Sequence, residues 1–120
     1  MKAVLVDDEK TGLDYLTKLC EDIPELTEIK GFTKSRSALD WCTKNPVDIA
    51  MLDINMPDIN GINLVKKLRE VKPDIKIIFV TAYEKYAIDA FDVHADGYLL
   101  KPVNQETLVR EVTHVLADFH

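Results

Sequence analysis

The chain has 120 residues and a formal net charge of −6, because 15 Lys and Arg face 21 Asp and Glu, which argues against direct binding of nucleic acid. Its 47% hydrophobic and 30% charged residues exclude a disordered or low-complexity chain and predict one domain over residues 1–120. No apolar run approaches the ~20 residues of a membrane span, and the N-terminus opens on a predicted strand rather than a signal peptide, so we expect a cytoplasmic protein without a membrane partner.

Five short apolar or β-branched runs predict five strands. In chain order they cover residues 3–6, 29–32, 49–52, 75–80 and 97–100. Short apolar runs without polar alternation are typical of strands that are covered on both faces, as in a parallel sheet.

Five stretches with helical spacing follow these strands. Their apolar residues are Leu13, Leu16, Cys20 and Ile23; Ala38, Leu39, Trp41 and Cys42; Leu64, Val65, Leu68 and Val71; Ala87, Ile88, Ala90 and Phe91; and Leu108, Val109, Val112, Val115, Leu116 and Phe119. Ser35 and Asn104 are the candidate N-caps of the second and fifth helices, and Gly61 is expected to end the loop before the third. Cys20 and Cys42 form no CxxC pair and are expected to be buried thiols. The alternation predicts an α/β fold with an open parallel sheet and helices on both faces.

The residues that follow the predicted strands are the candidate site, because ligands of open parallel sheets bind outside the carboxyl ends of the strands. Asp7 and Asp8 follow the first strand, Asp53 follows the third, Thr81 the fourth and Lys101 the fifth. The second strand contributes no such residue. Three carboxylates, a hydroxyl and an ammonium are therefore expected at one edge of the sheet.

This set of side chains favours a particular chemistry. Clustered carboxylates repel one another near neutral pH and need a cation. No Cys or His stands with them in the sequence, so the ligands are all oxygen, which favours Mg²⁺, with Mn²⁺ also possible. A lysine and a threonine hydroxyl suit phosphoryl oxygens, and a carboxylate can act as the nucleophile that forms an aspartyl phosphate.

At this point the motifs resemble those of a known family. Asp7-Asp8, the run from Asp53 to Gly61, Thr81-Ala82 and Lys101-Pro102 are similar to the receiver domain of two-component response regulators, in the family's order and over the whole chain. The resemblance implies a flavodoxin-like (βα)₅ fold with strand order 2-1-3-4-5.

The resemblance also implies a metal site. Asp53 would be the phosphoacceptor and Asp8 a direct Mg²⁺ ligand. Asp7 would reach the water molecules of the ion, and the backbone carbonyl of Asn55 would complete the protein ligands.

Further residues receive roles from the same resemblance. Thr81 and Lys101 would bind phosphoryl oxygens, and the Lys101–Pro102 peptide bond would be cis. Tyr98 would be the switch aromatic, which turns inward when Thr81 engages the phosphoryl group.

Two stretches narrow the resemblance further. The residues from Thr81 to Phe91 and from Tyr98 to Pro102 are most similar to receivers joined to LytTR-type DNA-binding domains. This implies a sensor histidine kinase as phosphoryl donor and an effector domain, attached or separate, through which transcription is controlled. We also expect the fourth helix, fifth strand and fifth helix to form an output surface, with a phosphorylation-linked homodimer as one outcome.

Two alternatives compete with this interpretation. A small Mg²⁺-dependent phosphatase typically carries a second Asp two residues after its nucleophile as the general acid, and Asn55 stands at that position. A neutral amide cannot protonate a leaving alkoxide, so we expect no enzyme but a phosphoacceptor domain that assists only its own phosphotransfer and dephosphorylation. A scaffold that works without phosphorylation is disfavoured, because every residue needed for phosphorylation is present.

Overall fold

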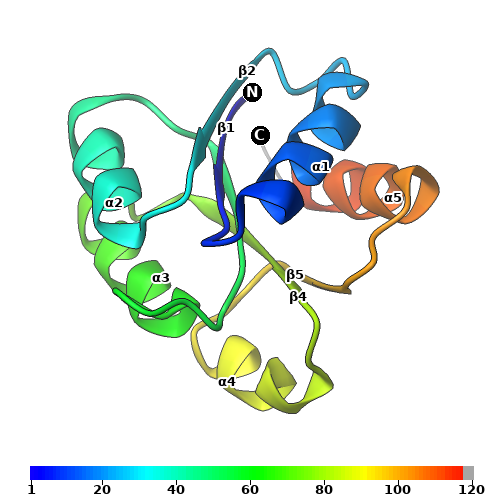
Figure 1. The fold of residues 1–120 in the computed structure, drawn as a ribbon. Helices are drawn as coiled ribbons and strands as arrows, with labels where there is room; N and C mark the ends of the chain where they lie inside the picture. The colour runs from blue at the N-terminus through cyan, green and yellow to red at the C-terminus, as the bar shows by residue number, and fades with distance from the viewer. Residues whose placement is uncertain (118–120) are drawn as a thin grey trace.

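The computed structural model describes residues 1–117 and contains a five-stranded parallel sheet with helices on both faces (Figure 1). The strands are β1 (Lys2–Val6), β2 (Glu28–Phe32), β3 (Ile49–Leu52), β4 (Lys76–Thr81) and β5 (Gly97–Leu100). The helices are α1 (Lys10–Glu21), α2 (Ser35–Lys44), α3 (Gly61–Val71), α4 (Ala87–Asp92) and α5 (Gln105–Leu116), and a short 3₁₀ helix, η1 (Glu84–Tyr86), precedes α4. The predicted α/β class is confirmed, and β3 and β5 have the predicted bounds.

The strand order is β2-β1-β3-β4-β5, which confirms the order that the family resemblance implied. The chain moves from β1 outward to β2 and then crosses back to β3 on the other side of β1. Val6, the last residue of β1, pairs with Leu52, the last residue of β3. The residues that follow these two strands, Asp7 and Asp53, therefore leave the sheet side by side at the point where the strand order reverses.

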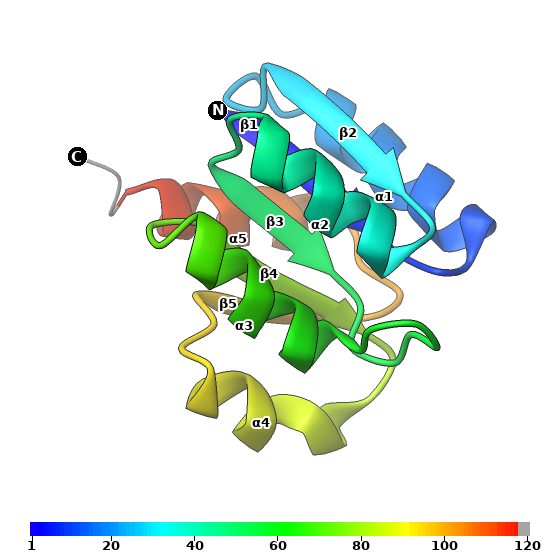
Figure 2. The same ribbon diagram turned by 90° about the vertical axis from the view of Figure 1, so that its left-hand side faces the viewer.

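The core has one layer on each face of the sheet. In Figure 2, α2 and α3 lie in front of the sheet and α1 and α5 behind it. The alternate residues of β3 contribute to both layers: Ala50 and Leu52 join the cluster with α2 and α3, whereas Ile49 and Met51 join the cluster with α1 and α5. Both faces of this strand are thus covered, which explains its continuous apolar sequence.

Both cysteines are buried free thiols, as predicted. Burial raises the pKa of the Cys20 thiol to about 12, with a further contribution from the charge of Glu21. Burial likewise raises the pKa of Cys42 to about 11, although Lys72 opposes this shift. The two thiols act as small apolar core groups on opposite faces of the sheet.

One of the two predicted helix caps is wrong. Helix α2 begins at Ser35 itself, and the N-cap position is taken by Lys34, whose side chain makes no capping hydrogen bond. The Ser35 hydroxyl instead donates to the carbonyl of Ile59 at 2.7 Å, where it is buried against the loop that follows β3. Asn104 is confirmed as the cap of α5, since its side chain accepts from the backbone N–H of Thr107 at 2.8 Å.

Helix α4 differs from the apolar stripe that its spacing predicted. Ile88 and Phe91 are 76% and 79% exposed, and only Ala90 of the helix is buried. The helix has six residues, so one small side chain suffices to contact the sheet side while the larger apolar groups face outward. Phe119, the last member of the stripe predicted for the fifth helix, lies outside the described residues. None of the helices within residues 1–117 is long and apolar enough to cross a membrane.

Candidate functional site

Lys101 joins two carboxylates at the carboxyl edge of the sheet. Its Nζ lies 2.8 Å from Oδ2 of Asp7 and 2.9 Å from Oδ2 of Asp53. The other oxygen of each carboxylate accepts a backbone N–H, from Glu9 at 2.9 Å for Asp7 and from Ile54 at 2.7 Å for Asp53. The two acids are therefore fixed by backbone groups next to them in the chain and by the shared ammonium of Lys101, which directly follows β5.

Asp8 completes a cluster of three carboxylates. Ligand atoms of Asp7, Asp8 and Asp53 all lie within 4.8 Å of one another. Asp7 is 3% exposed and Asp53 is 9% exposed, whereas Asp8 is open to solvent. Three carboxylates around one ammonium leave an excess of negative charge, and their hard oxygen donors fit a cation such as Mg²⁺ that keeps several water ligands. Asn55 lies two residues after Asp53, exposed in the loop that leads to α3.

The two carboxylates that contact Lys101 stabilise its protonated form. Burial, the largest single influence, lowers the pKa of Lys101, but hydrogen bonds and charge attraction from Asp7 and Asp53 outweigh it, so that its pKa is raised above the usual value. Lys101 is consequently an ammonium at neutral pH. It lies where it could also donate hydrogen bonds to phosphoryl oxygens attached to Asp53.

Thr81 and Tyr98 lie at the same end of the sheet. Thr81 ends β4 and is fully buried, and its hydroxyl oxygen accepts a long hydrogen bond of 3.4 Å from the N–H of Tyr83. Tyr98 packs edge-on against Phe79, and its hydroxyl donates to the carbonyl of Tyr83. The backbone N–H of Lys101 donates to the carbonyl of Thr81 at 2.8 Å, which ties the ends of β4 and β5 together.

Gly61 places the loop that follows Asp53. A Cβ at this position would lie 2.2 Å from the carbonyl oxygen of Asp53 and 2.8 Å from the Cα of Ile54. The N–H of Gly61 donates to the carbonyl of Ile54 at 2.8 Å, and Asn60 caps α3 by accepting from the N–H of Asn63 at 2.9 Å. Gly61 begins α3 as predicted, but its close approach to Asp53 was not foreseen from the sequence.

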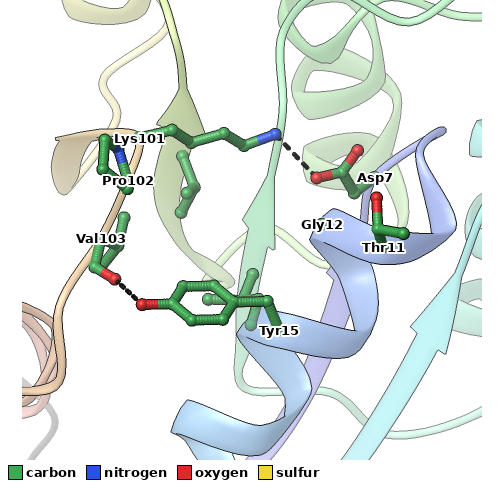
Figure 3. Close-up of a pocket in the computed structure, with 9 residues that line it drawn as sticks. Asp7, Thr11, Gly12, Tyr15, Lys101, Pro102 and Val103 are labelled. Atoms are coloured by element: carbon green, nitrogen blue, oxygen red, sulfur yellow. Dashed lines mark hydrogen bonds and ion pairs between the residues drawn. The ribbon is translucent and has the colours of Figure 1, made fainter.

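A pocket of about 470 Å³ lies next to the carboxylate cluster, between α1 and the connection from β5 to α5 (Figure 3). Its lining consists of Asp7, Thr11, Gly12, Tyr15, Leu16, Val80, Lys101, Pro102 and Val103. The Tyr15 hydroxyl donates to the carbonyl of Val103 at 2.7 Å. Sequence reasoning missed Tyr15 because it lies beside the apolar stripe of α1 and its partner is 88 residues away. Only the fold brings these two residues together.

The structure thus brings Asp7, Asp8, Asp53 and Lys101 together, with Thr81 at the same edge. The Lys101–Pro102 bond is cis, as the resemblance implied.

A model of the family described as response regulator receiver domain matches residues 3–113. The transcriptional regulatory protein LytR of Staphylococcus aureus is 38% identical over 117 residues, which are 98% of this chain and 48% of that protein. The sensory transduction protein LytT of Bacillus anthracis is 38% identical over 110 residues, 92% of this chain and 45% of that protein. The chain therefore spans about half the length of the curated relatives that it matches.

Solved structures of response regulators are also similar to this chain. The response regulator TrrA of Thermotoga maritima, described as a complex with Mg(2+)-BeF, has a TM-score of 0.84 and 34% identity, covering 97% of this chain and 100% of that one. The response regulatory domain of MrkE from Klebsiella pneumoniae has a TM-score of 0.88 and 26% identity, covering 98% and 96%.

Proposed function

This chain belongs to the response regulator receiver domain family, and from that premise we propose that Asp53 accepts a phosphoryl group from a sensor histidine kinase. The observation that carries the proposal is the position of Lys101 Nζ, 2.9 Å from Asp53 and 2.8 Å from Asp7, beside a third carboxylate. A nucleophilic carboxylate flanked by a cation and a cluster of metal-ligand type oxygens is the arrangement that phosphoryl transfer needs.

The step transfers one group between two residues. An oxygen of Asp53 forms a bond to phosphorus, the bond from phosphorus to the histidine nitrogen of the kinase breaks, and its electron pair stays on the imidazole. Lys101 and the Thr81 hydroxyl receive the oxygens of the transferred group. Lys101 Nζ already lies 2.9 Å from Asp53, and Thr81 ends β4, the strand next to β3.

Mg²⁺ is the proposed cofactor, with Mn²⁺ as a substitute. Asp8 and Asp53 would ligate the ion directly with the carbonyl of Asn55, and Asp7 would hold its water molecules. When bound, the ion offsets the carboxylate charge and stabilises negative charge on the transferred oxygens. The all-oxygen cluster and the similarity to TrrA, described as a complex with Mg(2+)-BeF, support this assignment.

The output of the domain is proposed from its relatives and its exposed surface. The relatives of this chain include the transcriptional regulatory protein LytR, so we propose control of transcription through a DNA-binding effector, attached or separate. Ile88 and Phe91 of α4 are exposed, and we propose the face of α4, β5 and α5 as the output and homodimer surface. Tyr98 links β5 to the loop after Thr81 through its hydrogen bond to Tyr83. It would be the switch that connects phosphorylation at Asp53 to the output surface.

Incubation with acetyl phosphate and Mg²⁺ distinguishes a phosphoacceptor domain from a phosphatase. Intact mass should show one phosphoryl adduct per chain, formed with Mg²⁺ and not with EDTA. Sustained hydrolysis of p-nitrophenyl phosphate without an adduct would contradict the proposal and favour a phosphatase, since the chain would then release product repeatedly.

A further inference from the structure

Tyr15 is an exposed side chain with a specific partner. It is 50% exposed on α1, yet its hydroxyl donates to the carbonyl of Val103 at 2.7 Å (Figure 3). An exposed tyrosine could satisfy its hydroxyl with water, so the hydrogen bond is not needed to avoid an unsatisfied polar group. The hydrogen bond matters because it fixes the segment between β5 and α5, which contains Val103.

That segment carries Lys101. Strand β5 ends at Leu100 and α5 begins at Gln105, so residues 101–104 form a short connection. Its beginning is fixed by the backbone bond from Lys101 to the carbonyl of Thr81, at 2.8 Å. Its end is fixed by the buried side chain of Val103 and by the bond from Tyr15 to the Val103 carbonyl.

The pocket lies along one side of this connection and leaves that side without packed neighbours. The space of about 470 Å³ lies against Lys101, Pro102 and Val103, so part of this connection faces open volume rather than packed side chains. The position of Nζ then depends on where the backbone of the connection lies. Tyr15 spans the pocket from α1 to that backbone, as Figure 3 shows.

We propose that Tyr15 is a positioning residue for phosphoryl acceptance. By tying the connection to α1, it keeps the Lys101 ammonium within reach of oxygens attached to Asp53. The inference rests on the proposed role of Asp53. The carboxylates of the metal cluster follow β1 and β3 and do not lie on this connection, so Tyr15 should affect the binding of a phosphoryl group more strongly than that of the metal, which it reaches only through the contacts of Lys101 with Asp7 and Asp53.

The test compares Tyr15→Phe with Thr17→Val. Tyr15→Phe removes one oxygen atom and keeps the ring in place. Thr17→Val removes a hydroxyl from the same helix that donates to the Leu13 carbonyl at 2.7 Å, within α1 and away from the connection. Calorimetry gives the Kd of Mg²⁺ and then, at saturating Mg²⁺, the Kd of beryllofluoride, an analogue of the phosphoryl group on Asp53. Intact mass gives the rate of phosphorylation by acetyl phosphate.

In Tyr15→Phe we expect about a three- to tenfold weaker affinity for beryllofluoride and a similarly slower phosphorylation, which is the size of one lost hydrogen bond. The Kd of Mg²⁺ should change by less than the Kd of beryllofluoride, and Thr17→Val should behave as wild type in every measurement. Wild-type affinity for beryllofluoride in Tyr15→Phe would overturn the inference, as would an equal loss in both variants. If the wild-type chain itself takes up neither beryllofluoride nor a phosphoryl group, the proposed function fails, and this outcome is distinct from the first two.

Discussion

Lys101 is the residue on which the proposed site depends most. It lies between two buried acids, and the hydrogen bonds that it makes keep Asp7 and Asp53 close despite their like charges. Each acid also accepts one backbone N–H, so its orientation survives when the ammonium moves toward another oxygen. The lysine can therefore exchange a carboxylate partner for a phosphoryl partner without disturbing the acids.

Gly61→Ala should destabilise the fold by about 3 kcal/mol, the upper range for overpacking, because the new Cβ would meet the Asp53 carbonyl at 2.2 Å and the backbone cannot yield locally. Chemical denaturation measures the free energy of unfolding. The matched control is Gly31→Ala, where the Cβ would meet only the flexible side chain of Leu13 at 3.2 Å. We expect that control to stay within about 1 kcal/mol of wild type. Equal losses in the two variants would show that the contact at Gly61 has no special cost.

The sequence was informative about single residues where their role follows from position along a strand. Asp7, Asp53 and Lys101 each come directly after a strand, so their shared edge followed from the topology. Ser35 and Tyr15 could not be predicted, because each forms its hydrogen bond with a residue that is distant in the sequence. A local pattern holds no information about such a partner.

At the scale of elements, α4 has fewer buried residues than any other α-helix within residues 1–117. It has six residues, one of them buried, and its C-terminal end is held from α3. Arg69 donates to the carbonyls of Val93 and His94 at 2.8 and 2.9 Å and lies 3.6 Å from Asp96. These bonds join α3 to the segment that leads from α4 into β5, at the end opposite the carboxylate cluster.

Arg69→Met should loosen α4 and lower the free energy of unfolding by about 1–3 kcal/mol, because two carbonyls lose a charged donor. Hydrogen exchange should accelerate over residues 87–96 and stay unchanged in α1. Arg36→Met is the control, since Arg36 makes an exposed ion pair with Asp58 at 3.9 Å, worth under about 0.5 kcal/mol. Unchanged exchange in α4 of the Arg69 variant would refute the anchoring role.

The exposed face of α4 leads to a prediction about association. Phosphoryl oxygens would draw Thr81 and, through the loop after it, Tyr98, so the proposed output surface should respond to beryllofluoride. We expect sedimentation to detect dimers of the wild-type chain with Mg²⁺ and beryllofluoride, and fewer dimers for Phe91→Ser, which removes an exposed apolar contact. Lys44→Ser in α2 serves as the control, because α3 separates α2 from α4 on this face of the sheet (Figure 2). A wild-type chain that stays monomeric with beryllofluoride bound would exclude this surface as a dimer contact in the isolated domain.

At the scale of the whole molecule, folding and the proposed metal binding should be linked, because the cluster joins residues from the ends of β1 and β3 and exists only in the folded chain. Mg²⁺ at about tenfold above its Kd should add about 1.4 kcal/mol to the free energy of unfolding. Thermal unfolding with and without Mg²⁺ measures the shift. Asp8→Ala should abolish most of it, and Asp14→Ala, whose carboxylate pairs with Lys10 on the surface of α1, should retain it. Equal shifts in wild type and Asp8→Ala would place the ion elsewhere.

The parts of the architecture that depend on hydrophobic periodicity and on the positions of the strand ends were predictable from the sequence. The five strands, the helices on both faces and the edge that holds the acids followed from the apolar runs, whereas the strand order came from the family resemblance. The outward direction of Ile88 and Phe91 was not predictable, because a six-residue helix has too few turns for spacing to define its buried face. The pocket beside Tyr15 depends on how α1 and α5 pack on the sheet, which no local pattern encodes.

The central claim is that Asp53 carries the phosphoryl group, and peptide mapping of the phosphorylated chain tests it most directly. After incubation with acetyl phosphate and Mg²⁺, the adduct of the wild-type chain should lie on Asp53. The Asp53→Asn variant should fold, since its amide oxygen can still accept the Ile54 N–H, and it should take up no phosphoryl group. An adduct on another residue of the wild-type chain, or an undiminished adduct in Asp53→Asn, would contradict the account.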